Sequence, residues 1–327
     1  MTFAKSITRR ALLATASGVL LARRASAGAD WPNGPIKLIV PFAPGGSNDI
    51  LARVLAGKLA ERLGQSVIID NKGGAGGVIG TNYVAKAPPD GYTLLFASTS
   101  ITTNAAIRKD LPYDPLKDLQ PIGEVGAGPF VVVVSNQLGV KTLQEFIDLA
   151  RSKPKQLNYG TAGAGGINHL GTELLAKEAK IELVHVPYKG IGPAFNDLIA
   201  GRLQMLLPTV ASVVQLIHSR QMLGLAVTSK ERSPLAPELP TAIEAGLPDY
   251  ELEAWWGLLG PAQMPATVVA RLNAELNTVL QLPDVIEVLM REGAASLPGT
   301  QEAFGHLISS DLTRWKQLIS DAHIQIE

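Results

Sequence analysis

The sequence contains no cysteine among its 327 residues. The chain therefore has no disulfide bond, no thiolate ligand for a metal and no cysteine for a lipid anchor. Aromatic residues are also scarce, at 5% of the chain, whereas 46% of the residues are hydrophobic. A chain of this length and hydrophobic content can build the core of one large domain or of two smaller ones.

An excess of either charge is also lacking, since 29 basic residues face 29 acidic ones. The first 27 residues distort this balance, because they hold five basic residues and no acidic one. Without these five, 24 basic residues remain against 29 acidic ones, which gives a net charge of −5. A mildly acidic body without a basic stripe argues against nucleic acid or anionic lipid as a partner.

Long hydrophobic runs are missing apart from Ala11 to Ala22, which is too short to span a bilayer, since that takes about 20 residues. Lys5, Arg9 and Arg10 precede this run, and Ala25-Ser26-Ala27 follows it as an A-x-A cleavage site. This order is typical of an export signal. We therefore predict that residues 1–27 are removed and that the mature chain begins near residue 28, in the periplasm.

The export route stays open between two alternatives. Thr8-Arg9-Arg10-Ala11-Leu12-Leu13 resembles a twin-arginine signal. A general secretory signal that contains two arginines by chance is the other interpretation.

Familiar catalytic motifs are absent as well: the chain has no G-x-S-x-G, no P-loop and no H-E-x-x-H. Residues 74–80 show a loose G-x-G-x-x-x-G, and we expect no nicotinamide cofactor in an exported protein. His169 and Glu173 lie four residues apart on a predicted helix, which favours a helix-surface pair over a metal site, because no third ligand is evident. We therefore expect no cofactor, no metal and no enzymatic activity.

The stretch from Pro35 to Gly64 organises the chain. Ile36 to Val40 predicts a buried strand, Pro41 to Gly46 a loop, and Ser47 or Asn48 the N-cap of a helix that closes at Gly64. The first N–H groups of a helix lack partners and its dipole is positive there, so this loop can hold an anion. A plain strand-to-helix connection is the alternative.

The same order recurs later in the chain, where a strand at 156–159 is followed by the glycine-rich loop 160–166 and by a helix at 167–180. Alternating strands and helices favour mostly parallel sheets covered on both sides, with ligands bound beyond the carboxyl ends of the strands. This recurrence predicts an α/β chain with two lobes, each offering a glycine loop at a helix N-terminus. Trp255 and Trp256 lie in the expected second crossing between the lobes, where they favour core or hinge packing.

Single residues keep two interpretations each. Asp49 favours a pair with Arg53 and the helix dipole over a role as acceptor for a ligand amine or hydroxyl. Phe42 is equally suited to pack on a ligand or to anchor the core. Lys189 can pair with an anionic ligand or remain a solvated loop lysine.

Taken together, several motifs resemble the extracytoplasmic solute receptors of the tripartite tricarboxylate transporter system, the Bug family, over nearly the whole mature chain. These motifs are Trp31-Pro32, the segments 39–46 and 71–77, Asp49 with Ala52-Arg53, the segment 87–95, Val186-Pro187-Tyr188-Lys189-Gly190 with Gly192-Pro193-Ala194, and Trp315. One departure is Gln204, where similar proteins often carry an acid.

The resemblance implies a two-lobed periplasmic-binding-protein fold of type II-like form, whose cleft closes on a small organic anion. A ligand carboxylate would sit between the loop at Gly45-Gly46-Ser47 and the loop at Gly163-Ala164-Gly165. We expect lobe 1 to comprise residues 28–131 and 256–327, and lobe 2 residues 132–255. The expected ligand-binding residues are Phe42, Ala43, Gly45, Gly46, Ser47, Asp49, Ser98, Thr99, Thr161, Ala162, Gly163, Gly165, Gly166, His169, Pro208 and Thr209.

The expected partners are a small organic carboxylate and the membrane permease subunits of a tripartite carrier, with the receptor itself a monomer and no nucleic acid bound. A ligand sensor that docks on a signalling receptor is the main alternative, and a secreted enzyme on the same scaffold is a further one. The sequence does not select one carboxylate, because backbone N–H groups recognise carboxylates generically.

Overall fold

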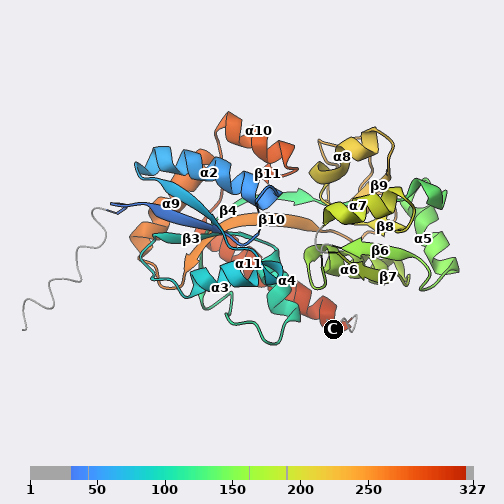
Figure 1. The fold of residues 1–327 in the computed structure, drawn as a ribbon, viewed down its shortest axis with the longest axis horizontal. Coiled ribbons are helices and arrows are strands. Elements are labelled where there is room, and N and C mark those ends of the chain that lie inside the picture. The colour runs from blue at the N-terminus through green and yellow to red at the C-terminus, as the bar shows by residue number, and fades with distance from the viewer. Residues whose placement is uncertain (1–30, 43, 162, 189–190, 322–327) are drawn as a thin grey trace, which may run out of the picture.

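The computed structural model describes residues 31–42, 44–161, 163–188 and 191–321. These residues form two lobes that lie side by side along the longest axis of the molecule, each built around its own β-sheet (Figure 1). The expected two-lobed α/β fold is therefore confirmed. Within the described residues, no helix is both long and apolar enough to cross a bilayer.

Lobe 1 contains a six-stranded sheet in the order β11-β4-β10-β3-β1-β2. Its strands are β1 (Ile36–Val40), β2 (Val67–Asn71), β3 (Thr93–Ser98), β4 (Leu119–Pro129), β10 (Glu253–Pro261) and β11 (Ala295–Ser296). β1 pairs in parallel with both β2 and β3, whereas β10 runs antiparallel to β3 and β4. The sheet is thus parallel among β1, β2 and β3 and antiparallel where the chain passes between the lobes.

Lobe 2 contains a five-stranded sheet in the order β7-β6-β8-β5-β9. Its strands are β5 (Val131–Val134), β6 (Asn158–Thr161), β7 (Val184–Pro187), β8 (Met205–Leu206) and β9 (Leu223–Val227). β6 is parallel to β7 and β8, whereas β5 is antiparallel to β8 and β9. The sheets are therefore more mixed than the sequence predicts, because strands that return from a crossing run against their neighbours.

Helices cover both faces of the sheet in lobe 1. They are α2 (Ser47–Leu63), α3 (Val78–Ala85), α4 (Ser100–Ile107), α9 (Ala266–Val279), α10 (Pro283–Arg291) and α11 (Gln301–Asp321). On one face, Leu51, Leu55 and Leu59 of α2 are fully buried, and each such leucine contributes about 1.5–3 kcal/mol of transfer free energy. On the other face, Ile101 of α4 and Phe304 of α11 belong to a second core cluster.

Lobe 2 is covered by α5 (Leu143–Ser152), α6 (Ile167–Ala179), α7 (Ile191–Ile199) and α8 (Val210–His218). Gln204, the departure noted in the sequence, has a structural role here. Its side-chain oxygen accepts the N–H of Asn158 at 2.8 Å, and its side-chain nitrogen donates to the carbonyl of Gly201 at 3.2 Å. The amide therefore fixes the start of β6, where backbone groups would otherwise lack partners.

Two crossings join the lobes. The first runs from β4 through Phe130 into β5, and the second leads through Leu252 into β10. The buried hydroxyl of Thr228 connects them, because it accepts the N–H of Phe130 at 2.9 Å and donates to the carbonyl of Leu252 at 2.5 Å. Trp255 and Trp256 are both buried, which confirms the expectation that they pack in the core. The lobe boundaries at 131/132 and 255/256 stay a proposal.

The sequence reading missed one long strand, β4. Glycines at 123, 126 and 128 disguise it, since glycine in a strand interior usually weakens it. Here glycine is required by close approach: a Cβ added at Gly126 would lie 2.3 Å from the carbonyl oxygen of Ala295. The sequence patterns also do not predict helices α4, α8 and α10.

Candidate functional site

The loop between β1 and α2 is shaped by two glycines. Gly45 has a φ of +90°, a conformation that residues with a Cβ rarely adopt, and Gly46 is extended and forms the N-cap of α2. The expectation that Ser47 or Asn48 caps the helix is therefore wrong, because the glycine backbone fills this place and Ser47 is already helical. The N–H of Gly45 points back into the helix and donates to Oδ2 of Asp49 at 3.0 Å.

Asp49 holds this loop in place. Its side chain is buried, and besides the N–H of Gly45 it accepts Nε of Arg53 at 2.9 Å and Nδ2 of Asn71 at 3.0 Å. The hydrogen bond from Arg53, helped by those from Gly45 and Asn71, lowers the pKa of Asp49 to about 2 against the opposing effect of burial. Asp49 is therefore ionised and occupied by protein donors, which confirms its pairing with Arg53.

The loop between β6 and α6 repeats this arrangement in lobe 2. Gly163 and Gly165 have φ values of +133° and +78°, and Gly166 is the extended N-cap of α6. The N–H of Gly165 donates to Nδ1 of His169 at 3.1 Å. In both lobes, therefore, the side chain four residues after a left-handed glycine captures that glycine's N–H. We call this contact the loop lock.

His169 differs from the exposed residue that the sequence suggested. It is buried and stacks on His185 with ring centroids 4.1 Å apart, while Tyr159 stacks on His185 at 5.1 Å. The expected helix-surface pair with Glu173 is wrong, because Glu173 instead accepts a hydrogen bond from the hydroxyl of Tyr159. No group of three possible metal ligands occurs among the described residues.

Burial, with a smaller contribution from His185, lowers the pKa of His169 to about 4. The imidazole is therefore neutral near pH 7. Its Nδ1 carries no proton, because it accepts the N–H of Gly165. Burial also lowers the pKa of His185, whose Nε2 lies 2.7 Å from the hydroxyl of Thr161. The lock in lobe 2 is thus a neutral one.

Each lock leaves two further N–H groups at the helix start. The carbonyl of Gly46 accepts from Asp49 and Ile50, and the carbonyl of Gly166 accepts from His169 and Leu170. Within the described part of the chain, the N–H groups of Ser47 and Asn48 in lobe 1, and their counterparts at 167 and 168 in lobe 2, have no acceptor. Two unpaired N–H groups at the positive end of a helix dipole suit an anion.

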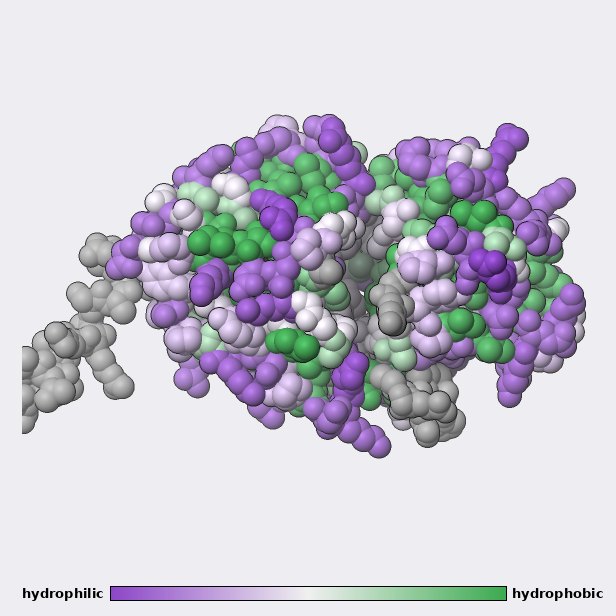
Figure 2. All heavy atoms as spheres, viewed as in Figure 1, coloured by the Kyte–Doolittle hydropathy of each residue, from purple (hydrophilic) through white to green (hydrophobic). Residues whose placement is uncertain are grey.

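Both helices point these ends toward the boundary between the lobes, where Figure 2 shows the surface deeply hollowed (Figures 1 and 2). The space beside the first loop is open: a Cβ added at Gly45 or Gly46 would meet no described atom within 4 Å. A Cβ at Gly166 would meet only the carbonyl oxygen of Gly163, at 3.6 Å. The space beside both helix starts is therefore open on the side of these glycines.

Other expected site residues have side chains that are partly occupied by protein partners. Ser98 Oγ is 3.0 Å from Ser100 Oγ, and Thr99 is buried with its hydroxyl accepting the N–H of Trp255 at 2.9 Å. Thr209 is the N-cap of α8, and its hydroxyl donates to Ser212 Oγ at 3.1 Å. Thr99 therefore braces the second crossing in addition to standing at the start of α4.

Phe42 and Pro208, also expected at the site, take part in hydrogen bonds through their backbone carbonyl groups. The carbonyl of Phe42 accepts Nδ2 of Asn71 at 3.1 Å, so the loop of lobe 1 is tied to the end of β2. The carbonyl of Pro208 accepts the N–H of Val131, which joins the approach to α8 to the first crossing. Ala43, Ala162 and Lys189 lie outside the described residues.

The sequence reading missed Asn71, Tyr159 and His185. Asn71 could have been found, because it ends the strand beside β1 and pairs in register with Val40. His185 and Tyr159 carry no such signal, since their stacking depends on how β6, β7 and α6 pack.

A family model described as the tripartite tricarboxylate transporter family receptor matches residues 51–324. A UPF0065 protein from the tcbD-tcbE intergenic region of Pseudomonas sp. (strain P51) is 40% identical over 290 residues, covering 88% of this chain and 86% of the relative. The structure of R. palustris Rpa4515 with adipate has a TM-score of 0.83 and 34% identity, covering 90% of this chain and 99% of the other. MatC (Rpa3494) from Rhodopseudomonas palustris with bound malate has a TM-score of 0.79 and 31% identity, covering 88% and 100%.

Proposed function

Since this chain belongs to the receptors of the tripartite tricarboxylate transporter family, we propose that it is a periplasmic solute-binding protein. It captures a small organic carboxylate between its two lobes and delivers it to a tripartite tricarboxylate-type membrane carrier. The observation that carries this proposal is the pair of locked glycine loops, each presenting unpaired N–H groups at a helix N-terminus.

The ligand contacts follow from this pair. Hydrogen bonds to a charged group are worth about 1.5–3 kcal/mol each, so two N–H groups per loop supply enough free energy to hold one carboxylate. Adipate and malate, bound to the two neighbours, are both dicarboxylates, and a dicarboxylate can engage both loops at once. We therefore propose a small dicarboxylate as the ligand, with the residues expected from the sequence around it.

Binding between lobes favours closure, because a ligand shifts a conformational equilibrium only through contacts that differ between its states. Contacts to both loops exist only when the lobes approach each other. Small-angle scattering with a saturating ligand should therefore show compaction, and an unchanged radius of gyration would count against a clamshell.

The decisive experiment is a thermal-shift screen of the mature protein against organic acids, beginning with adipate and malate. A ligand at about 100 times its Kd adds about 2.7 kcal/mol to the free energy of unfolding. Stabilisation by dicarboxylates but not by the matched dimethyl esters supports the proposal. A screen in which no carboxylate stabilises the protein would defeat it.

We also propose that residues 1–27 direct export and that the mature receptor is a monomer. N-terminal sequencing of periplasmic protein should recover a chain that begins near residue 28. Light scattering of the mature protein should give the mass of one chain, and an intact Met1 on cytoplasmic protein would contradict the export proposal.

A further inference from the structure

One face of the sheet in lobe 1 is only partly covered. Helix α3 has eight residues, and it covers the part of the sheet where Ile39 and Leu95 are buried together with Val84. One step back along the strands, Lys37 pairs in register with Ile68 of β2 on one side and with Thr93 of β3 on the other. Lys37 is exposed and Ile68 is 50% exposed, so this row of the sheet face lacks a cover.

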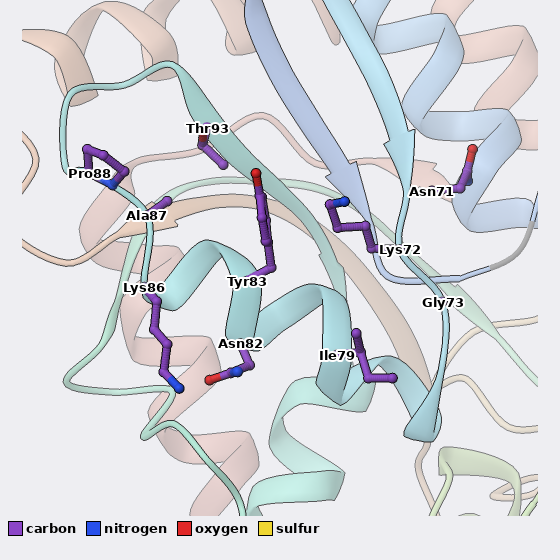
Figure 3. A pocket seen from close by; sticks show the side chains of 10 residues that line it. All are labelled: Asn71, Lys72, Gly73, Ile79, Asn82, Tyr83, Lys86, Ala87, Pro88 and Thr93. Atoms are coloured by element: carbon purple, nitrogen blue, oxygen red, sulfur yellow. The ribbon is translucent and has the colours of Figure 1, made fainter.

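A groove runs between this open row and α3. It encloses about 750 Å³, and its lining includes Lys72, Ile79, Tyr83, Lys86 and Thr93 (Figure 3). Ile79 and Tyr83 lie four residues apart on α3 and are 56% and 43% exposed. Neighbouring large side chains with this exposure form an apolar strip, and such a strip beside a groove is typical of an interaction site.

The groove is basic, although the mature body is acidic. Lys72 and Lys86 line it, and Lys37 lies on the sheet beside the lining residue Thr93. Asp70 pairs with one of these lysines, at 3.1 Å from Lys72 Nζ. The same ammonium group lies 4.6 Å from the ring centroid of Tyr83, where Figure 3 shows the two side chains directed toward each other. Lys37 and Lys86 have no ion-pair partner among the residues that the structure describes. This local excess of positive charge complements an acidic partner.

The strand beside the groove is an edge. β2 stands at the end of the sheet order and pairs with β1 alone among the described strands. An exposed strand edge can pair with an extended segment of another chain, whose alternate side chains then enter neighbouring pockets. A lipid surface offers neither a backbone for the edge nor side chains for the groove.

We infer that this groove, lined by Lys72, Ile79, Tyr83 and Lys86, and the open row of Lys37 and Ile68 beside it together dock an acidic, amphipathic segment of the carrier's membrane subunits. Acidic side chains of that segment meet the lysines, its apolar side chains pack on Ile79 and Tyr83, and its backbone runs along β2. This inference rests on the proposed function, since it names the surface through which the loaded receptor meets its carrier.

The test measures binding of the mature, full-length receptor to the membrane subunits encoded in the same genome, held in nanodiscs of zwitterionic lipid. Two groove variants are used, Lys72→Glu/Lys86→Glu and Tyr83→Ala. The matched control is Lys141→Glu/Lys153→Glu, which makes the same charge change at the ends of α5 in the outer part of lobe 2 (Figure 1). Adipate affinity is measured by calorimetry for every protein.

Both groove variants should weaken carrier binding at least tenfold while leaving adipate affinity and melting temperature unchanged. The control should bind the carrier like wild type, and raising the salt concentration should weaken wild type more than Lys72→Glu/Lys86→Glu. Equal carrier binding by the groove variants and the control would overturn the inference.

Three further outcomes would also overturn it. Tight binding of wild type to protein-free anionic nanodiscs would assign the groove to lipid, and a wild-type dimer that the groove variants abolish would assign it to a second copy of the chain. A wild type that binds adipate but not the carrier would overturn docking and leave carboxylate capture intact. By contrast, a wild type that binds no organic acid in the thermal screen overturns the proposed function itself.

Discussion

The two glycine loops have the same backbone plan but are locked by different chemistry. In lobe 1 the acceptor is the ionised carboxylate of Asp49, supported by Arg53 and Asn71. In lobe 2 it is the neutral imidazole of His169, held by stacking on His185. Both loops are therefore held by a buried hydrogen-bond acceptor four residues further along the chain. That acceptor is charged in lobe 1 and neutral in lobe 2.

The charge of this acceptor affects how strongly the loop can bind an anion. A negative lock repels a bound carboxylate, and the guanidinium of Arg53 offsets this repulsion because it lies 2.9 Å from Asp49. The neutral lock needs no such partner, but its acceptor titrates closer to the physiological range. The hydrogen bond that holds the loop of lobe 1 should thus depend little on pH but strongly on Arg53 and Asn71. The one in lobe 2 should depend on pH and need no charged partner.

The largest expected effect is a pH dependence that separates the locks. The pKa of His169 is about 4 in the fold and about 6.5 when unfolded, so the unfolded chain binds the proton more readily. The contribution of His169 to the free energy of unfolding is complete above pH 6.5. It is lost as the pH falls to 4, by an amount on the order of 3 kcal/mol. The stabilisation that Asp49 provides through its lowered pKa is lost only below about pH 4, so it does not change over this window.

Urea unfolding of wild type and His169→Phe between pH 7 and 4 checks this prediction. The stability of wild type relative to the variant should fall with pH over this window. The comparison is needed because Glu124, whose pKa burial raises to about 7, stabilises both proteins as the pH falls. Parallel profiles for the two proteins would contradict the assignment of His169 as a buried, neutral acceptor.

The next largest effect is expected from blocking the unpaired N–H groups at the starts of α2 and α6. Gly46→Val and Gly166→Val place a side chain at the two N-caps, where φ values of −93° and −74° suit any residue. Both variants should fold, yet lose dicarboxylate affinity about 100-fold, because each blocks two charge-assisted hydrogen bonds.

Calorimetry with the acid found in the thermal screen measures this loss. Gly34→Val is the control, since an added Cβ there meets no described atom within 4 Å and the residue precedes β1. Wild-type affinity in either cap variant would remove that lobe's loop from the site.

A smaller effect is expected when the charged lock is removed. Asp49→Ala leaves the N–H of Gly45, the amide of Asn71 and the guanidinium of Arg53 without their shared acceptor. The free energy of unfolding should fall by about 2 kcal/mol, a value kept low because Arg53 remains half exposed to water. Chemical denaturation at pH 7 tests this, with Arg53→Ala as the milder control that keeps the loop acceptor.

The smallest effect is expected for the neutral lock at pH 7. His169→Phe keeps an aromatic ring to stack on His185 and removes only the acceptor for Gly165. Ligand affinity should fall about fivefold, corresponding to about 1 kcal/mol for one neutral hydrogen bond. A loss larger than that of Gly166→Val would show that the imidazole itself contacts the ligand.

Sequence patterns predicted the strand, loop and helix of each site because these features are local. A β-branched run, a glycine pair and an apolar stripe at helical spacing each specify their own segment, as residues 36–64 illustrate. The two loops also share Gly-Gly-x-Asn before the lock residue, at 45–48 and 165–168, a signal that the sequence reading passed over in treating the recurrence as architectural alone.

The remaining features depend on contacts between distant segments. The burial of His169 follows from the packing of α6 on β6 and β7, and Asn71 acts across 22 residues on Asp49. β4 was not predicted because Gly126 and Gly128 are required by the close approach of the backbone at residues 293–295, which lies far along the chain. Contacts between segments that are far apart in the sequence produce no repeating pattern of residues, so they cannot be predicted from periodicity.

The hydroxyl of Thr228 bonds to both segments that join the lobes, at Phe130 and at Leu252. Because one buried group touches both, neither segment can bend without straining the bonds to the other. We therefore expect the two crossings to bend together and not one at a time.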